Sequence, residues 1–455
     1  MGKENTYSTP KLQDGQYVIP ESMTSFNPDC LLLGGDTDVC VKATSLLIHD
    51  SLTSICQGAF SHFTSLESFS VSKGNPGFTS EDGILYNKDK SVLIAFPARK
   101  AVENFVVPET VTRIGDKAFA GCKRLKSVRI PESVTEIGDG AFMDCSGIEQ
   151  MDALGSITEI SLNTFMGCEG MVSVAIPETV TRIGRSSFAY CSSLRNVTIP
   201  ESVTEIDDDA FCDTALRSVT LLASVKKIGG GAFSCPWMEP VQVSAENPCY
   251  CAVDGILYTK DMTELVAAPR EWRIGDFSIP ETVERIGDKA FFGCWWLTRL
   301  VIPDSVKEIG NRAFGFCTRL ERVVIPDSVS SIGVAAFDHC ESLFSASLPA
   351  SLDRIQTATF GYCKNLDIVI VSGSSIQIDM LAFDGCEGLT RFFCRDCDIR
   401  TVDVTDSSFA GASINRCALI VGGDVDAYRA HPVFSKFRDV HVPTPEDKLI
   451  YAVFC

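Results

Sequence analysis

Apolar residues return at fixed intervals along most of the chain. One full interval is LKSVRIPESVTEIGDGAFMDC at 125–145. The alternation in its first half predicts a strand with Val128 and Ile130 facing inward, and Pro131 ends that strand in a turn. Val134 and Ile137 form the next inward pair. Gly138 then allows a bend, and we expect Asp139 to cap a short helical turn that carries Phe142 and Cys145 on its inner side.

The phenylalanine and cysteine of this unit recur at a period of 23 residues. A period between about 20 and 50 residues is typical of a solenoid, in which each coil buries its apolar side against its neighbours. We therefore expect two internal ladders, one of phenylalanine and one of cysteine. They comprise Phe119, Phe142, Phe165, Phe188, Phe291, Phe314, Phe337, Phe360, Cys122, Cys145, Cys168, Cys191, Cys294, Cys317, Cys340, Cys363 and Cys386.

The repeated unit IPESVTEIG..AF..C..L..V.IP resembles the BspA-like class of leucine-rich repeats. The resemblance implies a leucine-rich repeat solenoid, rich in strands with short helical turns, as a curved array of about 13 coils. The segments at 75–97 and 247–269 resemble the hairpin insertions of that family. In the first of them we expect two strands, Gly83–Tyr86 and Val92–Phe96.

Three regions follow from this pattern. Residues 1–43 form an N-terminal segment and degenerate cap, 44–410 the repeat array, and 411–455 a C-terminal cap and tail. The segment 417–442 resembles the closing cap of such arrays, a strand, a short helix and a strand. A capping end with a polar face is expected because it keeps a solenoid soluble.

The 20 cysteines allow three interpretations. A thiol fixed by the repeat behaves as a small buried hydrophobic group, which favours a reduced ladder, although neighbouring coils could also bring sulfurs into bonding distance. Cys394 and Cys397 with Cys386 form a zinc candidate, but a fourth ligand is not supplied nearby. In a secreted protein, we expect Cys30 and Cys40 of the N-terminal cap to be bridged.

Charge and hydropathy limit the classes of partner and the cellular locations that the sequence favours. The formal net charge of −19 disfavours nucleic acid, and the longest apolar runs are too short for a transmembrane helix. The polar N-terminus lacks a secretory signal and favours a cytoplasmic location, whereas the family resemblance favours the cell surface or secretion. Gly2 followed by Thr6 fits the minimal N-myristoylation pattern, with a plain N-terminus as the alternative.

Motifs for catalysis are missing from the sequence. The five histidines lack metal-ligand spacing, and a nucleophile elbow, a phosphate-binding loop and a dinucleotide fingerprint are all absent. We therefore expect a non-enzymatic protein without a cofactor or metal. An enzyme whose pocket is not recognisable from sequence is the less favoured alternative.

A partner protein would meet the outward strand positions, which align from coil to coil. In the first series of repeats these positions are small and polar. In the second series they bring arginine and apolar residues together, as binding hot spots do. The candidate partner-binding residues are Arg299, Val301, Arg322, Val324, Ile368, Ile370, Arg391 and Phe393.

For Ile368, Ile370 and Phe393 an equally supported alternative is that the C-terminal cap covers them. The predicted function is a protein-binding scaffold that uses the face of the solenoid. The alternative that the family resemblance implies is a surface adhesin or antigen that binds host or matrix proteins.

Overall fold

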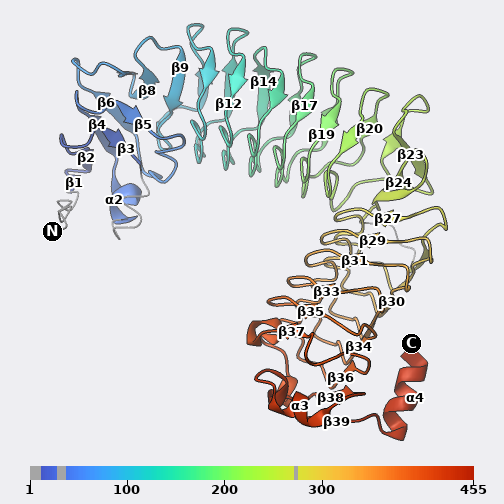
Figure 1. Cartoon of the computed structure of the whole chain (residues 1–455). Helices are drawn as coiled ribbons and strands as arrows, with labels where there is room; N and C mark the ends of the chain where they lie inside the picture. Colours follow the sequence, from blue (N-terminus) through green and yellow to red (C-terminus); the bar gives the residue numbers. More distant parts are fainter. Residues whose placement is uncertain (1–11, 28–36, 271–274, 455) are drawn as a thin grey trace, which may run out of the picture. The chain divides into compact units, whose positions relative to one another are not determined.

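The computed structural model describes residues 12–27, 37–270 and 275–454, so Gly2 and Cys30 lie outside the described residues. Internal contacts divide the chain into unit 1, Met1–Cys235, and unit 2, Pro236–Cys455. Each unit is a stack of coils with two rows of short parallel strands (Figure 1). The predicted solenoid class is confirmed. About 17 coils are present rather than 13, because coils without the Phe–Cys pair also join the stack.

In unit 1 the first strand of a coil pairs in parallel with its equivalent in the next coil, except at the insertion between residues 71 and 104 and before the last strand, at residues 220–221. This row consists of β2 (Gln16–Val18), β4 (Ser45–Ile48), β6 (Ser68–Val71), β10 (Asn104–Val106), β12 (Ser127–Ile130), β14 (Gln150–Leu154), β16 (Ser173–Ala175), β18 (Asn196–Thr198) and β20 (Thr220–Leu221). A short β1 (Leu12–Gln13) pairs antiparallel with β2, and α2 spans Thr37–Lys42.

The second row of unit 1 leads into the bend of each coil, and in four of its strands glycine follows the isoleucine, as Gly138 follows Ile137. It consists of β3 (Ser25–Phe26), β5 (Ser54–Ile55), β11 (Arg113–Ile114), β13 (Glu136–Ile137), β15 (Glu159–Ile160), β17 (Arg182–Ile183), β19 (Glu205–Ile206) and β21 (Lys227–Ile228). As the alternation predicts, Val128, Ile130 and Ile137 are buried.

Each insertion has three strands rather than the predicted two. In unit 1, β7 (Phe78–Glu81), β8 (Ile84–Asn87) and β9 (Val92–Ala95) are antiparallel, and β9 pairs in parallel with β11. The extra strand was missed because Thr-Ser-Glu of β7 is polar. The Asp82-Gly83 turn that joins β7 to β8 has positive φ at both residues, as a tight hairpin requires. The equivalent strands of unit 2 are β23 (Tyr250–Val253), β24 (Ile256–Thr259) and β25 (Glu264–Ala267).

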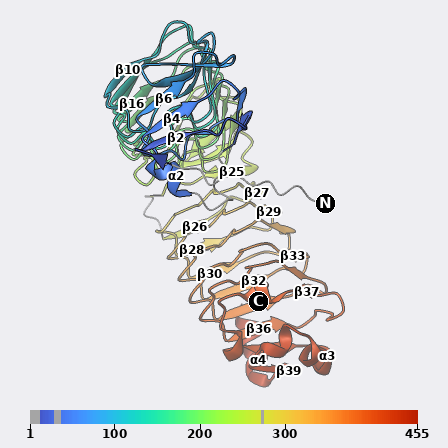
Figure 2. The ribbon, with the colours of Figure 1, turned by 90° about the vertical axis from the view of Figure 1, so that its left-hand side faces the viewer.

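Unit 2 repeats the arrangement, and Figure 2 shows its successive strands in order along the stack. Its first row is β22 (Gln242–Val243), β26 (Asp276–Ser278), β28 (Arg299–Val301), β30 (Arg322–Val324), β32 (Ser345–Leu348), β34 (Ile368–Val371), β36 (Arg391–Cys394), β38 (Ala418–Val421) and β39 (Asp439–His441). Its second row is β27 (Arg285–Ile286), β29 (Glu308–Ile309), β31 (Ser331–Ile332), β33 (Arg354–Ile355), β35 (Gln377–Ile378) and β37 (Asp403–Val404).

The C-terminal part of unit 2 adds helices to this frame. They are η1 (Asp406–Phe409), η2 (Ile414–Arg416), α3 (Val425–Ala430), η3 (Phe434–Lys436) and α4 (Pro445–Phe454). β38, α3 and β39 follow the expected order of strand, helix and strand. Among the described residues, none of the helices has the length and apolar character needed to span a membrane.

The third side of each coil is a series of β-turns, where a short helical turn was expected. Gly140 and Asp144 adopt positive φ, so helical hydrogen bonding is not continued through the segment. Alternate N–H groups instead reach the following coil, as when Phe142 N donates to Thr164 O at 2.8 Å. These turns also place the anchor phenylalanines inside, where Phe142 and Phe165 stack with centroids 5.4 Å apart.

Each unit contains a phenylalanine ladder. Phe188 lies between Phe165 and Phe211, with centroids at 5.3 and 5.2 Å and rings nearly parallel. In unit 2, Phe337 lies between Phe314 and Phe360 at 5.1 and 5.4 Å. Each ring is covered on both faces by neighbouring coils and is fully buried.

The cysteine ladder has a polar role that the sequence pattern did not reveal. Within the regular repeats the thiol donates to the carbonyl oxygen of the anchor phenylalanine in the preceding coil; Cys191 Sγ lies 3.1 Å from Phe165 O. The same bond, at 2.9 to 3.2 Å, is made by Cys145, Cys168, Cys317, Cys340, Cys363 and Cys386. Cys122 and Cys294, which follow the insertions, are instead 3.7 to 4.0 Å from carbonyl oxygens of the insertion. Cysteine thus combines the size of a small hydrophobic group with a hydrogen-bond donor.

Loss of one ring should leave a cavity between two coils. We expect Phe188→Ala to lower the free energy of unfolding by about 3–5 kcal/mol, as large-to-small changes in cores do. The exposed Arg195 of the same coil supplies the control, since Arg195→Ala should change the free energy of unfolding by less than about 0.5 kcal/mol. Urea denaturation followed by circular dichroism measures both, and equal effects of the two variants would contradict the ladder's role.

The buried thiols should resist alkylation in the folded protein. Burial raises the pKa of Cys191 and Cys386 to about 12, so almost no reactive thiolate exists at pH 8. Iodoacetamide should therefore modify these two residues only after unfolding, whereas the partly exposed Cys249 should react in the native state. Peptide mass spectrometry reads out each site. Rapid native labelling of Cys191 would disprove the buried ladder.

Candidate protein-binding face

The outward positions of β28 and β30 form a small exposed patch in unit 2. Arg299 pairs in register with Arg322, and Val301 with Val324. Both arginines are exposed, and the two valines are 59% and 44% exposed. All four residues, predicted as partner contacts, therefore lie on one accessible surface, which we call the β28–β30 patch.

The two arginines of the β28–β30 patch place like charges on adjacent strands. Neighbouring strands are about 4.8 Å apart, so the guanidinium groups repel each other unless an anion lies between or above them. Within the described part of the chain, no ion pair engages Arg299. The patch is suited to a partner that brings carboxylates together with apolar side chains.

The remainder of the predicted stripe is covered. Ile368, Ile370 and Phe393 are buried together with Ala418 and Ile420, in a cluster on the outward face of the sheet. Ile450 and Tyr451 of α4 pack on this cluster. The structure therefore shows that the C-terminal cap covers these three residues. The alternative prediction, that they are exposed for a partner, is wrong.

The start of α4 has the features of a stable helix N-terminus. Thr444 N donates to Asp447 Oδ2 at 2.9 Å, and Asp447 N donates to Thr444 Oγ1 at 3.2 Å. This reciprocal pair, with Pro445 at the first helical position, satisfies free N–H groups and sets the helix direction. Thr-Pro-Glu-Asp at 444–447 was the sequence signal for α4, and our sequence analysis missed it.

Arginine side chains contact both ends of α4. At its start, Arg391 Nη2 lies 2.8 Å from Glu446 Oε1, and Arg391 Nε lies 4.0 Å from the buried carboxylate of Asp447. At its end, Arg322 Nη2 donates to Val453 O at 3.1 Å. Acidic groups at the N-terminus and a cation at the C-terminus both complement the helix dipole.

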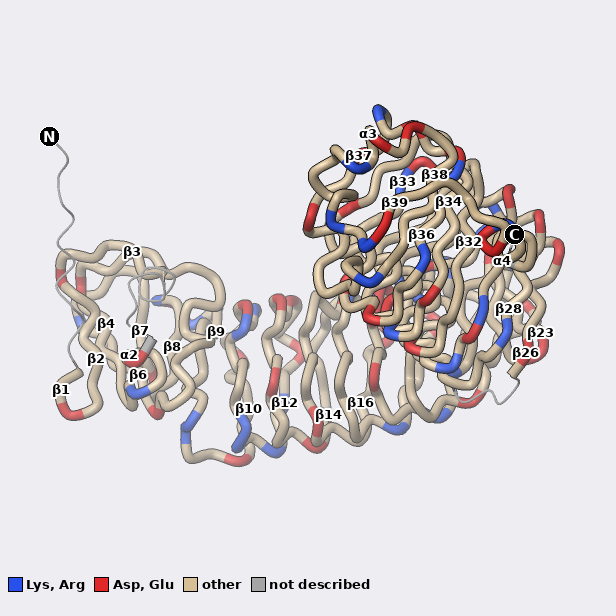
Figure 3. The backbone as a smooth tube through the Cα atoms, turned by 90° about the horizontal axis from the view of Figure 1, so that it is seen from below, with Lys and Arg blue, Asp and Glu red and all other residues tan. Residues whose placement is uncertain are grey.

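The axis of α4 crosses the strands instead of following one of them. Arg391 belongs to β36 and Arg322 to β30, three strands away in the sheet order. Three strand spacings amount to about 14 Å, which matches the roughly 15 Å length of a ten-residue helix. Figure 3 shows the C-terminal end of the chain beside β32, with which α4 is in contact.

Comparison with known proteins agrees with the repeat pattern. The model of the BspA type leucine-rich repeat region matches residues 37–82, 94–177, 158–248 and 270–390. This chain belongs to the BspA-type leucine-rich repeat family. A search of curated proteins found no significant match.

Two solved structures illustrate the family fold. A leucine-rich cell surface protein from Faecalibacterium prausnitzii is 29% identical, with a TM-score of 0.58, over 79% of this chain and 89% of that one. The pneumococcal vaccine antigen PcpA is 18% identical, with a TM-score of 0.56, over 81% of this chain and 96% of that one. The second likeness shows the shared fold alone.

The outward face of unit 1 differs from that of unit 2. Several of its outward positions carry small residues, such as Ser173 and Ala175 on β16, which are exposed. A bulge in β14 shifts the register, so that Arg129 pairs with Ala153 where a regular repeat would place Asp152. Among the described strands of this BspA-type array, an outward arginine followed two residues later by an apolar residue occurs in β28, β30 and β36 of the second series.

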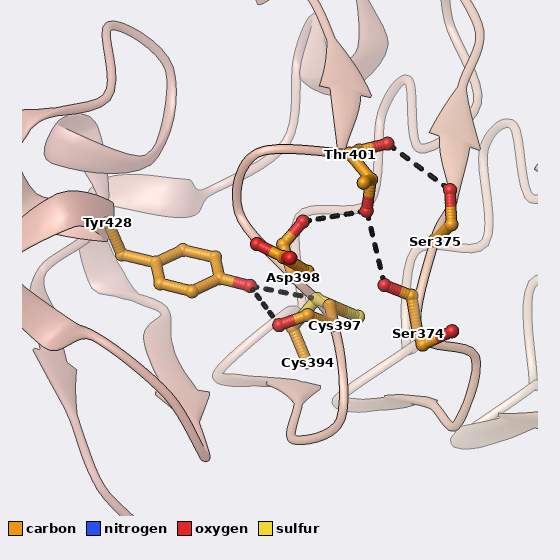
Figure 4. The surroundings of a disulfide bond; sticks show 7 residues. All are labelled: Ser374, Ser375, Cys394, Cys397, Asp398, Thr401 and Tyr428. Atoms are coloured by element: carbon orange, nitrogen blue, oxygen red, sulfur yellow. Dashed lines mark hydrogen bonds between the residues drawn. A yellow bond between two sulfur atoms is a disulfide. The ribbon is translucent and has the colours of Figure 1, made fainter.

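Cys394 and Cys397 form a disulfide (Figure 4). Both are buried, and Tyr428 of α3 donates its hydroxyl to Cys397 O at 3.0 Å. Cys386 instead donates its thiol to Phe360 O, so the three cysteines of the zinc candidate are not assembled as ligands. Among the described residues no three His, Cys, Asp or Glu side chains gather as a metal site.

Two of the surface hollows of unit 1 have volumes of about 610 and 690 Å³. The first is lined by Arg99, Lys117, Lys123 and Arg124, with Asp144 and Glu169 at its margin. The second surrounds Arg182, whose Nη2 lies 2.5 Å from Asp207 Oδ2. These charged, open hollows show neither a nucleophile–base pair nor a set of oxyanion donors among their lining residues.

One serine–histidine pair occurs outside these hollows. Ser51 Oγ lies 2.6 Å from His49 Nδ1, and the same oxygen lies 2.7 Å from Glu21 O. The two residues belong to one turn, in which Ser51 N also donates to His49 Nδ1. The pair lacks a carboxylate that orients the imidazole, so it is best explained as a turn that caps its own backbone.

If Arg391 holds the start of α4, reversing its charge should loosen the helix. Arg391→Glu brings a carboxylate against Glu446 and Asp447, and we expect amide exchange in residues 445–453 to become about three to ten times faster, the scale of a partly exposed ion pair. Exchange and mass spectrometry measure this change. Arg299→Glu, on the same face but away from α4, should leave the exchange of α4 unchanged.

The double variant Arg391→Glu/Glu446→Arg should recover part of the protection, because the pair is restored with its charges exchanged. Unchanged exchange in Arg391→Glu would show that Arg391 does not hold α4.

Proposed function

We propose that this chain is a non-enzymatic scaffold that binds a partner protein through the outward strand face of unit 2. The observation that carries the proposal is the seating of α4 on that face. A surface that buries five apolar side chains under a helix has the composition of a protein interface. The β28–β30 patch continues the same surface from the end of the helix, where Arg322 contacts Val453 O, and its four residues are exposed.

The partner's contact surface should be acidic and apolar. The chain has a net charge of −19, so most of its surface repels acidic proteins at long range. Arg299 and Arg322 make the charge locally positive, and a carboxylate of the partner placed over Arg299 would offset the repulsion between the two arginines. Val301 and Val324 beside them supply the apolar area that a charged contact alone lacks.

We further propose that binding takes place at the cell surface. The family, and the Faecalibacterium protein described as a cell surface protein, support this location. The Cys394–Cys397 disulfide agrees with it, since disulfides persist mainly in oxidising surroundings. A role as an adhesin that contacts host or matrix proteins is the specific form of this proposal.

The β28–β30 patch can be tested with a panel of purified host cell-surface and matrix proteins immobilised for interferometry. At least one should bind the full chain, and Arg299→Glu/Val301→Asp should bind it at least about tenfold more weakly, as loss of hot-spot residues does. The matched control is Ser173→Asp/Ala175→Asp, at equivalent exposed positions of β16, which should bind within about threefold of the original chain.

Circular dichroism of the two variants serves as the control for correct folding. The proposal is wrong if the panel yields no ligand, or if the β28 variant retains full binding to every ligand found.

A further inference from the structure

The outward face of unit 2 repeats one arrangement on three strands. An arginine is followed two residues later by an apolar residue in Arg299/Val301, Arg322/Val324 and Arg391/Phe393. On β36, α4 shows what this arrangement binds. Glu446 pairs with Arg391, while the Tyr451 ring lies edge-on to Phe393 at 6.1 Å and under Arg395 at 5.2 Å.

The docked helix is short and partly exposed on its other side. Leu449 and Val453 are 68% and 56% exposed, and the half-buried Ile450 and Tyr451 provide the packing on the apolar cluster. A ten-residue helix is not stable alone in water, so α4 depends on this face for its order. Its ion pair with Arg391 is partly open to solvent, where such pairs are weak.

The surface extends further than α4 does. From β36 to β28 there are four strand spacings, about 19 Å, which a helix of roughly 13 residues would span. Such a helix would cover Val301 and Val324 and bring its C-terminal carbonyls to both Arg299 and Arg322. A longer helix would therefore gain contacts that α4 lacks, which is the differential affinity that displacement requires.

We propose that the β28–β38 face is a docking surface for an amphipathic helix of a partner protein with an acidic first turn. In the free chain α4 covers part of this surface, and the partner helix displaces it. This inference rests on the proposed function and specifies the partner. The partner helix should run in the same direction as α4. Its acidic first turn then lies at Arg391, and its C-terminus points toward Arg322 and Arg299.

The test uses the full chain and a helix supplied in solution. The probe is a fluorescent peptide with the sequence of residues 443–454, PTPEDKLIYAVF. The chain variant Glu446→Gln/Ile450→Asp weakens the hold of its own α4, because it removes the ion pair with Arg391 and the apolar contact. Fluorescence anisotropy should show that the peptide binds this variant at least tenfold more tightly than the unchanged chain.

Two controls distinguish peptide binding at the β28–β38 face from unspecific binding. Leu449→Asp changes the exposed side of α4, so the peptide should bind this chain as weakly as it binds the unchanged chain. Adding Arg391→Glu to the loosened variant should weaken the binding of the peptide at least tenfold. A peptide with Lys at the position of Glu446 should then bind this charge-reversed chain better than the original peptide does.

The inference is overturned if the peptide does not bind the loosened, folded variant, or binds it regardless of the charge at residue 391. It is also overturned if light scattering shows dimers that exchange α4, since a second copy would then be the occupant. These failures differ from failure of the proposed function, which is judged by ligand binding to Arg299→Glu/Val301→Asp and does not involve α4.

Discussion

The contact on which this protein depends is the stacking of one coil interior on an identical one. Phe188 has both ring faces covered, by Phe165 and Phe211, and neither neighbour belongs to its own coil. A single coil would expose its ring, its strand edges and its thiol, so it cannot be stable alone. The same need explains the closing cap, in which Phe437 meets Phe409 edge-on at 5.4 Å and ends the stack.

Stacking also makes the side chains of the interior chemically unreactive. The repeated cysteine satisfies a backbone carbonyl in the preceding coil, as Cys340 does with Phe314 O, and its burial raises the pKa of the thiol well above the ordinary value. A thiol in that state is neither a nucleophile nor a metal ligand at neutral pH. Functional variation is therefore confined to outward positions, which the stack does not constrain.

The outward strand face of unit 2 illustrates that freedom. Apolar residues on the outside of a parallel sheet must be covered or they remain an exposed patch. Over Ile368, Ile370 and Phe393 the cover is α4, held at its start by Arg391. Over Val301 and Val324 the face is open. Both parts belong to one sheet, so intramolecular cover and an accessible binding surface meet on the same face.

The sequence by itself determined the repeat, its inward residues and the arginine-rich stripe, because a period of 23 residues places equivalent side chains in equivalent coils. It did not reveal β7, whose polar residues resemble a turn, or the thiol bond to Phe165 O, which joins residues 26 apart. Only the tertiary structure decided that Phe393 is buried while Val301 is exposed. The two occupy the same position of the repeat, and what distinguishes them is a helix about 55 residues further along, which pairs Glu446 with Arg391.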